Sequence, residues 1–259
     1  MKKIRLIARL DVKGSNLVKG IQYEGLRKLG DPHDFAYKYY QQGIDELLYL
    51  DTVASLYERN NLAGILSHTA SDVFIPITAG GGLRRLEDVQ AVLNAGADKV
   101  AVNTAALRRP EIIREIAQAF GSQCVVLSVQ AKRRDAKDAS LGWEAYYDNG
   151  REHSGKDVLE WVKQAQMLGA GEILVTSVDC EGFRKGMDLS LIEQVCAISD
   201  VPVIAAGGAA SVEDIVQAAK IGTDAVAVGS ILHYEQQSVM KIKQQLEQNG
   251  IEVRKWTNG

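Results

Sequence analysis

The chain has 259 residues, of which 46 % are hydrophobic and 24 % are charged, and its formal net charge is −3. This length and mixture are those of an ordinary globular protein, built as one large α/β barrel or as two smaller domains. The small net charge gives no broad field for binding nucleic acid or an anionic membrane, and no stretch approaches the roughly 18 consecutive apolar residues of a membrane-spanning helix.

The N-terminal stretch and the cysteines both indicate a cytoplasmic protein. In the segment MKKIRLIARLD, Arg5 and Arg9 interrupt the apolar run, so this stretch is too short and too charged for a signal peptide. The three cysteines, Cys124, Cys180 and Cys196, form neither a CxxC pair nor a zinc-ligand pattern. We therefore expect reduced thiols in a reducing cytoplasm.

Short β-branched runs alternate with amphipathic helical segments along the whole chain. Eight such βα units predict a (β/α)₈ barrel, the TIM barrel, as a single domain over residues 1–259. An insertion at about 133–155 carries an Asn149–Gly150 turn signal between strand-like flanks, and we expect a small hairpin there, as part of a lid or wall on the C-terminal rim. The predicted strands are 4–11, 46–51, 74–78, 99–103, 124–130, 172–177, 201–206 and 225–229.

The two halves of the chain resemble each other. One offset of 126 positions relates three pairs of segments: 45–51 and 171–177, the helical 86–96 and 212–222, and 98–107 and 224–233. A repeat that holds one offset over this length predicts an internal two-fold repeat of half-barrels, about 1–120 and 121–259.

Glycine-rich turns follow several predicted strands, and they share this paired pattern. Glycine lets backbone N–H groups approach an anion closely, and the following helix N-terminus adds a favourable dipole. Because barrel enzymes place their sites at the C-terminal strand ends, the pairs predict two phosphate sites on opposite sides of one barrel mouth. Alternatively, these glycines only shape the turns. The candidate phosphate-binding residues are Gly81, Gly82, Asn103 and Thr104 in the first half, and Gly182, Gly207, Gly208, Gly229 and Ser230 in the second.

Two polar residues end strands on opposite sides of the predicted barrel. Asp11 ends the first strand in ARLDVKG, and Gln130 ends the fifth in VVLSVQAK. A carboxylate at the mouth serves as a general acid or base if its pKa is tuned, whereas an amide keeps its hydrogen-bonding capacity but cannot ionise. Alternatively, Asp11 is a buried carboxylate satisfied by the adjacent loop.

Four strands begin with a charged residue, on the face of a barrel where charge usually contributes to stability. Two cations and two anions at one constriction would neutralise each other. One interpretation is that they simply close this end of the barrel. These residues are Arg5, Glu46, Lys99 and Glu172.

The histidines indicate no metal site. His33, His68, His153 and His233 show no metal-binding spacing, and we expect all four at the surface or the rim. No dinucleotide fingerprint is present either. We therefore expect neither a metal nor another cofactor.

Several stretches are specific enough to indicate a family: LDVKG, LVKG, GIDEL, ITAGGGL, GADKVAVNTAA, FGSQ, PVIAAGGA and DAVAVGS. Through them the chain resembles the cyclase subunit family of imidazole glycerol phosphate synthase over essentially its whole length. The resemblance implies a barrel paired with a glutaminase, a class I glutamine amidotransferase. The ammonia that the glutaminase releases passes through the barrel to a phosphoribosyl-bearing bisphosphate. Two aspartates are the catalytic acid and base of this family; Asp11 matches the first, and Gln130 stands in the position of the second.

The resemblance also implies roles for other residues. Lys19, in the loop after the first strand, matches a lysine on a mobile active-site loop, although from the sequence alone it reads as a solvated lysine. The four charged strand beginnings match a gate through which ammonia enters. Asp98, beside Lys99, matches a position that faces the partner.

An amide at position 130 removes one proton-handling group, and such a loss costs about 10² to 10⁴ in rate. The pattern is similar to the family's paralogues linked to surface-polysaccharide (lipopolysaccharide) biosynthesis. It predicts an ammonia-channelling subunit that serves a separate aminosugar amidotransferase, which amidates an acetamido sugar. The alternative is the imidazole glycerol phosphate synthase cyclase of histidine biosynthesis, tolerating Gln130. A sugar-phosphate isomerase is disfavoured, because it needs an acid–base residue where Gln130 stands.

Overall fold

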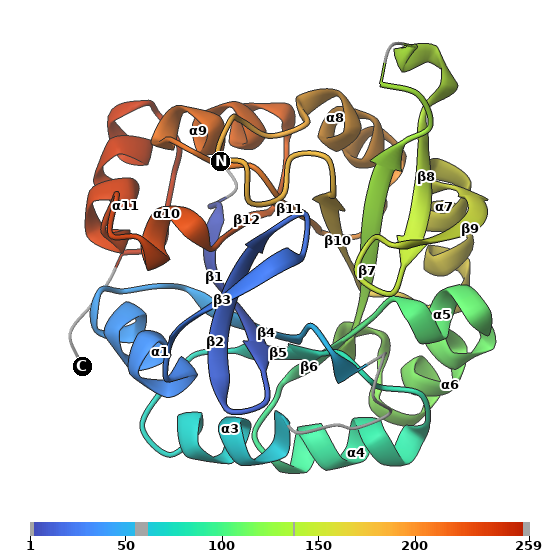
Figure 1. Cartoon of the computed structure of the whole chain (residues 1–259), viewed down its shortest axis with the longest axis horizontal. Helices are drawn as coiled ribbons and strands as arrows, with labels where there is room; N and C mark the ends of the chain where they lie inside the picture. The colour runs from blue at the N-terminus through green and yellow to red at the C-terminus, as the bar shows by residue number, and fades with distance from the viewer. Residues whose placement is uncertain (1–2, 55–61, 137, 256–259) are drawn as a thin grey trace.

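Parallel strands close into an eight-stranded barrel in the computed structural model, which describes residues 3–54, 62–136 and 138–255 (Figure 1). The strands pair in the order β1–β4–β5–β6–β7–β10–β11–β12, and β12 pairs with β1 to close the barrel. The predicted (β/α)₈ barrel is therefore confirmed. The barrel strands are β1 (Arg5–Lys13), β4 (Glu46–Asp51), β5 (Ile77–Gly80), β6 (Lys99–Val102), β7 (Val125–Arg133), β10 (Glu172–Ser177), β11 (Val203–Ala206) and β12 (Ala225–Val228).

Helices surround the barrel on its outer side (Figure 1). None of those within the described ranges combines the length and the apolar character that crossing a lipid bilayer would require. They are α1 (Pro32–Gln41), α3 (Leu62–Thr69), α4 (Leu86–Asn94), α5 (Thr104–Arg108), α6 (Glu111–Phe120), α7 (Val158–Leu168), α8 (Leu189–Ile198), α9 (Val212–Ile221), α10 (Ser230–His233) and α11 (Val239–Gln248), with the 3₁₀ turns η1 (Ser122–Cys124) and η2 (Ala139–Leu141).

Two barrel strands continue past the C-terminal rim into antiparallel hairpins. β1 extends to Lys13 and β7 to Arg133, so the predicted strands 4–11 and 124–130 ended too early. The additional residues are stabilised outside the barrel by antiparallel partners. Figure 1 shows the first hairpin across the barrel opening and the second projecting away from it. The hairpin strands are β2 (Asn16–Ile21), β3 (Glu24–Gly30), β8 (Trp143–Tyr147) and β9 (Glu152–Asp157).

The third barrel strand starts later than predicted. The sequence pattern placed it at 74–78, whereas β5 begins at Ile77. Pro76 has no backbone N–H to donate to a neighbouring strand, and the side chain of Phe74 is 74 % exposed. An apolar run therefore marked the right region but not the residues that pair.

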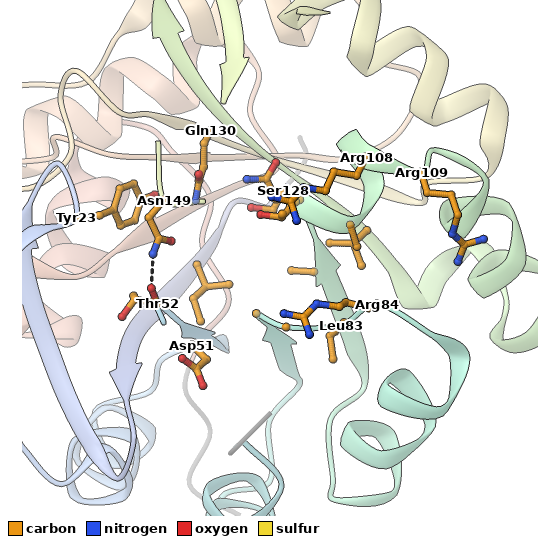
Figure 2. A pocket seen from close by; sticks show the side chains of 18 of the residues that line it. Tyr23, Asp51, Thr52, Leu83, Arg84, Arg108, Arg109, Ser128, Gln130 and Asn149 are labelled. Carbon is orange, nitrogen blue, oxygen red and sulfur yellow. Dashed lines mark hydrogen bonds between the residues drawn. The ribbon is translucent and has the colours of Figure 1, made fainter. Parts of the chain in front are cut away.

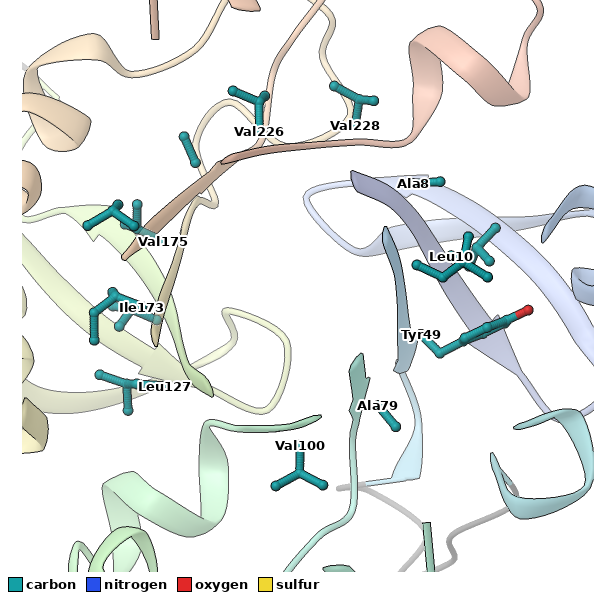
Figure 3. Close-up of a cluster of buried hydrophobic side chains, with 14 of the residues drawn as sticks. Ala8, Leu10, Tyr49, Ala79, Val100, Leu127, Ile173, Val175, Val226 and Val228 are labelled. Carbon is teal, nitrogen blue, oxygen red and sulfur yellow. The ribbon is translucent and has the colours of Figure 1, made fainter. Parts of the chain in front are cut away.

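The barrel wall separates two apolar layers. Outer side chains such as Leu10, Val100, Leu127 and Ile173 point away from the barrel axis, toward the helices (Figure 3). Because successive side chains along a strand point to opposite faces, a second set fills the barrel interior. Strands buried on both faces explain why the sequence shows continuous apolar runs rather than alternation. The interior set is Ile7, Leu48, Ala101, Val126, Leu174, Ile204, Ala206, Ala225 and Ala227.

The half-barrel repeat is visible in matching polar contacts. Asp98 accepts the backbone N–H of Ile77 at 2.8 Å, and Asp224, 126 positions later, accepts that of Val203 at 2.9 Å. A second pair of aspartates, each at the third position of α4 or α9, accepts the two N–H groups that precede its helix. Equivalent side chains thus fix equivalent turns in both halves, as the predicted two-fold repeat requires.

Asp188 connects the outer hairpin to α8, and we predict that it is a major contributor to stability. Its carboxylate accepts the N–H of Leu191 at 3.2 Å and the indole N–H of Trp143 at 3.0 Å, and it pairs with Arg133 at 2.9 Å. Asp188→Ala should lower the free energy of unfolding by about 3 kcal/mol, because it removes a helix cap and leaves a buried indole N–H unpaired. Urea unfolding measures this loss.

Asp157→Ala is the matched control, because Asp157 caps α7 by accepting the N–H groups of Leu159 and Glu160. It should cost only about 1 kcal/mol. Equal losses in the two variants would contradict the interpretation.

Candidate functional site

The four charged strand beginnings form one closed ring, the lower ring, at the N-terminal end of the barrel. Arg5 donates to Glu46 at 2.8 Å and also pairs with Glu172, and Lys99 donates to the same two carboxylates at 3.2 and 2.9 Å. Burial disfavours the charge on Arg5, but the two glutamates outweigh this effect and raise its pKa. The ring is electrically neutral, and each charge has partners where an unpaired one would be costly.

A second neutral ring, the upper cluster, lies at the C-terminal mouth and consists of Arg9, Asp11, Lys19 and Glu181. Arg9 Nε donates to one oxygen of Asp11 at 2.8 Å, and Lys19 Nζ donates to the other at 3.1 Å. Both cations also pair with Glu181, in the case of Arg9 at 3.3 Å. All four side chains are buried. Two cations and two carboxylates therefore neutralise each other at this end as well.

The upper cluster holds Asp11 in its ionised form. Burial alone would raise the pKa of Asp11, but Arg9 and Lys19 together lower it to about 2. The reverse holds for Lys19: burial opposes its charge, and Asp11 and Glu181 raise its pKa. Because acid–base catalysis is most efficient when a pKa lies near the working pH, Asp11 in this arrangement is a poor proton acceptor until a cation moves.

Lys19 is carried by strand β2, not by an irregular loop as the sequence suggested. The hairpin of β2 and β3 places its ammonium over the mouth, and the side chain is 5 % exposed. The interpretation of Lys19 as a solvated lysine is therefore wrong.

Gln130 lies on a large cavity of about 250 Å³. Its side-chain oxygen accepts the N–H of Gly150 at 2.8 Å, so the turn between β8 and β9 fixes the amide. Figure 2 shows Gln130 and Asp51 on opposite sides of this cavity, with Arg84 and Arg108 extending into it. Burial raises the pKa of Asp51, against hydrogen bonds from two backbone N–H groups.

The glycine turns line two cavities. Gly81, Gly82, Asn103 and Thr104 line the large cavity. The side-chain oxygen of Asn103 is buried and accepts no hydrogen bond from any described residue. A small cavity of about 20 Å³ lies on the other side of Arg9, which lines both. The small cavity is lined by the second glycine set, Gly182, Gly207, Gly208, Gly229 and Ser230.

Two of these turns need glycine whatever they bind. Gly81 and Gly207 have φ of 106° and 94°. A Cβ on them would lie 2.5 Å from the carbonyl oxygen of Asp51 and 2.8 Å from that of Ser177. Glycine is therefore required by the turn geometry at these positions, which neither supports nor excludes anion binding.

Arg9, Glu181 and Tyr23 were missed as site residues by the sequence analysis. Tyr23 accepts a hydrogen bond from Arg9 at 3.0 Å. A signal existed for Arg9: it lies two residues before Asp11 on an apolar strand, and therefore on the same inward face. Glu181 directly precedes Gly182, which the sequence analysis predicted as a phosphate-binding residue.

His233 was expected at the surface or the rim, but its side chain is buried and contacts the backbone of Arg9. Its Nε2 lies 3.0 Å from the carbonyl oxygen of Arg9, and its Nδ1 lies 2.8 Å from the hydroxyl of Tyr39. The carbonyl can only accept, so Nε2 carries the proton of the neutral ring. Across the described ranges, no three His, Cys, Asp or Glu side chains are grouped as metal ligands would be.

We predict that His233 makes folding sensitive to mild acid. Burial, and next the charge of Lys19, lower its pKa from 6.5 to about 4. Between these values the unfolded chain binds a proton that the folded protein does not, so stability falls as the pH is lowered through this window. Asp11, with its pKa of about 2, loses its contribution only at lower pH.

The measurement is the free energy of urea unfolding at pH 7.5 and at pH 5. The wild type should lose about 2 kcal/mol more than His233→Gln, which keeps a donor and an acceptor. Parallel losses in the two proteins would show that His233 does not cause the effect.

Comparison with known proteins identifies the family. The family described as "Histidine biosynthesis protein" matches residues 5–238. Proteins named "Imidazole glycerol phosphate synthase subunit HisF" match most of the chain. The Legionella pneumophila protein is 56 % identical over 83 % of this chain and 99 % of its own length. The Streptococcus sanguinis protein is 46 % identical over 98 % of this chain and 100 % of its own length.

These relatives overturn one expectation from the sequence. The chain was predicted to be a channelling subunit for amidation of an acetamido sugar in surface-polysaccharide biosynthesis, with an aminosugar amidotransferase as a further partner. Relatives that are 43–56 % identical carry the name of the histidine-pathway synthase subunit instead, so that prediction is wrong, and the alternative is favoured. The chain belongs to the HisF-like cyclase family of histidine biosynthesis proteins.

Proposed function

We propose that the chain is the cyclase subunit of an imidazole glycerol phosphate synthase. It acts on a phosphoribosyl-bearing bisphosphate and receives ammonia from a glutaminase partner. The names of its relatives support this assignment. The observation that carries it is that two glycine-lined cavities meet at the upper cluster, which contains Asp11, at one barrel mouth.

The large cavity suits one phosphate end of such a ligand. Arg84 and Arg108 line it, and arginine forms charge-assisted, bidentate hydrogen bonds with phosphate. Thr104 adds a hydroxyl, and the buried oxygen of Asn103 suits an N–H or O–H donor on the ligand. The other phosphate end belongs in the small cavity.

Asp11 is the carboxylate that we assign to proton transfer. Ammonia that attacks a carbon atom of the ligand must lose a proton, and a carboxylate at the mouth accepts it. Gln130 donates and accepts hydrogen bonds but does not exchange protons near neutral pH. At the ends of β1 and β7, acid–base chemistry then depends on Asp11 alone, and we expect slower turnover than from a site with a carboxylate at both strand ends.

The test is turnover of the bisphosphate with ammonium as the nitrogen source. Asp11→Asn should lower kcat by about 10² to 10⁴, because it removes the proton acceptor, and Gln130→Asp should raise kcat because it supplies a second one. Asp31→Asn is the matched control, because Asp31 caps α1 by accepting the N–H of His33 and asparagine caps equally well.

Growth provides an independent readout. The wild-type chain should rescue a histidine auxotroph that lacks its own cyclase. Failure to rescue, together with no detectable turnover in the wild type and in Gln130→Asp, would refute the proposed function.

We assign the passage of ammonia to the barrel axis and the docking of the glutaminase to the N-terminal face. Between the lower ring and the upper cluster, the interior is lined by apolar side chains such as Ile7, Leu48 and Leu174. Neutral ammonia crosses such a layer at far lower cost than ammonium. Asp98 is exposed beside Lys99 on the face where the partner would dock.

Lys99→Met tests the lower ring as an ammonia gate. It leaves Arg5 as the ring cation that pairs with Glu46 and Glu172, because the two hydrogen bonds from Lys99 are lost. We expect glutamine-dependent turnover to fall while ammonium-dependent turnover is largely retained, and the ratio of the two rates measures this. Lys163→Met, on the exposed face of α7, is the control. An equal fall of both rates would show that the ring only stabilises the fold.

A further inference from the structure

Arg9 lies where the two cavities meet. It lines the large cavity together with Gln130, and it also lines the small one. Its side chain is 2 % exposed, and its three nitrogens donate to Asp11, Glu181 and Tyr23 at 2.8, 3.3 and 3.0 Å. A ligand that spans both cavities must therefore pass this guanidinium.

The small cavity has no space for a phosphate in this arrangement. Its volume of about 20 Å³ is enough for about one water molecule. Lys19 Nζ lies 3.6 Å from the position that a Cβ on Gly229 would take, so the ammonium lies within the cradle itself. A phosphate group can enter only if the ion pairs of the upper cluster rearrange.

Charge balance indicates how they rearrange. The upper cluster is neutral, so a phosphate brings excess negative charge into a buried site. Three cations line this cavity: Arg184, which is exposed, and the buried Arg9 and Lys19. Of the two buried cations, Arg9 has the planar guanidinium that matches phosphate geometry. Arg9 and Lys19 give their hydrogen bonds to Asp11, Glu181 and Tyr23, so a movement of either cation toward phosphate weakens these contacts.

We propose that Arg9 is a specificity-determining and positioning residue that exchanges partners: it pairs with Asp11 and Glu181 until a phosphate occupies the small cavity, and then pairs with that phosphate and releases Asp11 for proton transfer. A ligand whose only anion lies in the large cavity does not trigger this exchange. The identity of the ligand rests on the proposed function. The inference adds a second requirement to that function: the ligand must carry an anionic group that reaches the small cavity.

A purely structural role for Arg9 makes different predictions. As a permanent counter-ion of Asp11 and Glu181, Arg9 would keep its hydrogen bonds whether or not phosphate is bound. Its replacement would then change stability, but not affinity for phosphate.

The first test uses inorganic phosphate as the probe and needs no turnover. The side-chain Nε–H resonance of Arg9, assigned by its loss in Arg9→Lys, should shift and saturate on titration with phosphate, against potassium chloride at equal ionic strength. Ser230→Asp places a carboxylate in the cradle and should abolish the shift. An Arg9 resonance that does not respond to phosphate would overturn the proposal, whether or not phosphate binds elsewhere.

The second test compares variants. Arg9→Met should weaken phosphate binding in the small cavity by about tenfold or more, because a charge-assisted partner is lost, and Arg9→Lys should restore part of it. If Arg9→Met does not fold, Arg9→Lys and the wild-type titration still decide the outcome. Equal phosphate affinity in the wild type and in a folded Arg9 variant would overturn the proposal.

Turnover separates this proposal from the proposed function. In an active enzyme, Arg9→Lys should raise KM for the bisphosphate more than it lowers kcat. A wild-type chain that shows the phosphate-dependent shift but no cyclase turnover would refute the proposed function and leave the exchange by Arg9 intact.

Discussion

Charge neutralisation in places that water hardly reaches constrains both ends of this barrel. Each end holds two cations and two carboxylates in a closed ring, and apolar side chains fill much of the barrel interior between them. Because a buried charge without a partner is costly, no member of either ring can change without a consequence for the others. This dependence links Asp11 to residues on the hairpin and on the loop after β10.

The two cavities at the mouth differ although the fold is a repeat. Gly81 and Gly207 occupy equivalent positions and leave equally little room for a side chain. The second cavity is small because Lys19 and Arg9 extend into it, and both come from the first half of the chain. The asymmetry of the mouth therefore comes from these long side chains and from the hairpins: the one that carries Lys19 crosses the opening, whereas the other projects away from it (Figure 1).

The sequence predicted the architecture, and several residues that it indicated lie together in the lower ring or along the two cavities. β4 and β10 have the predicted bounds, 46–51 and 172–177, because each has a continuous apolar stretch, LLYL or ILV, between polar ends. The repeat indicated the paired glycine turns, and the four charged residues at strand beginnings indicated the lower ring. These features depend on local periodicity, which can be recognised directly in the sequence.

Contacts between distant segments could not be predicted in this way. The hairpin at Asn149–Gly150 was expected because that dipeptide favours a tight turn. The hairpin of β2 and β3 was read as a loop, because its turn residues, Gln22 and Tyr23, carry no such signal. The pairing of Arg9 with Glu181 joins residues 172 positions apart, and no local pattern encodes it.

The turn between β2 and β3, at the tip of the first hairpin, has an unusual backbone conformation. Gln22 and Tyr23 have φ of 49° and 63°, in the left-handed region, which costs a residue other than glycine about 1–2 kcal/mol. Two contacts hold it: the N–H of Gln22 donates to the carbonyl of Glu181 at 2.9 Å, and the hydroxyl of Tyr23 accepts from Arg9. The side chain of Arg9 and the backbone of Glu181 thus stabilise this turn. A change in the ion pairs of the upper cluster should therefore also alter the conformation of this turn.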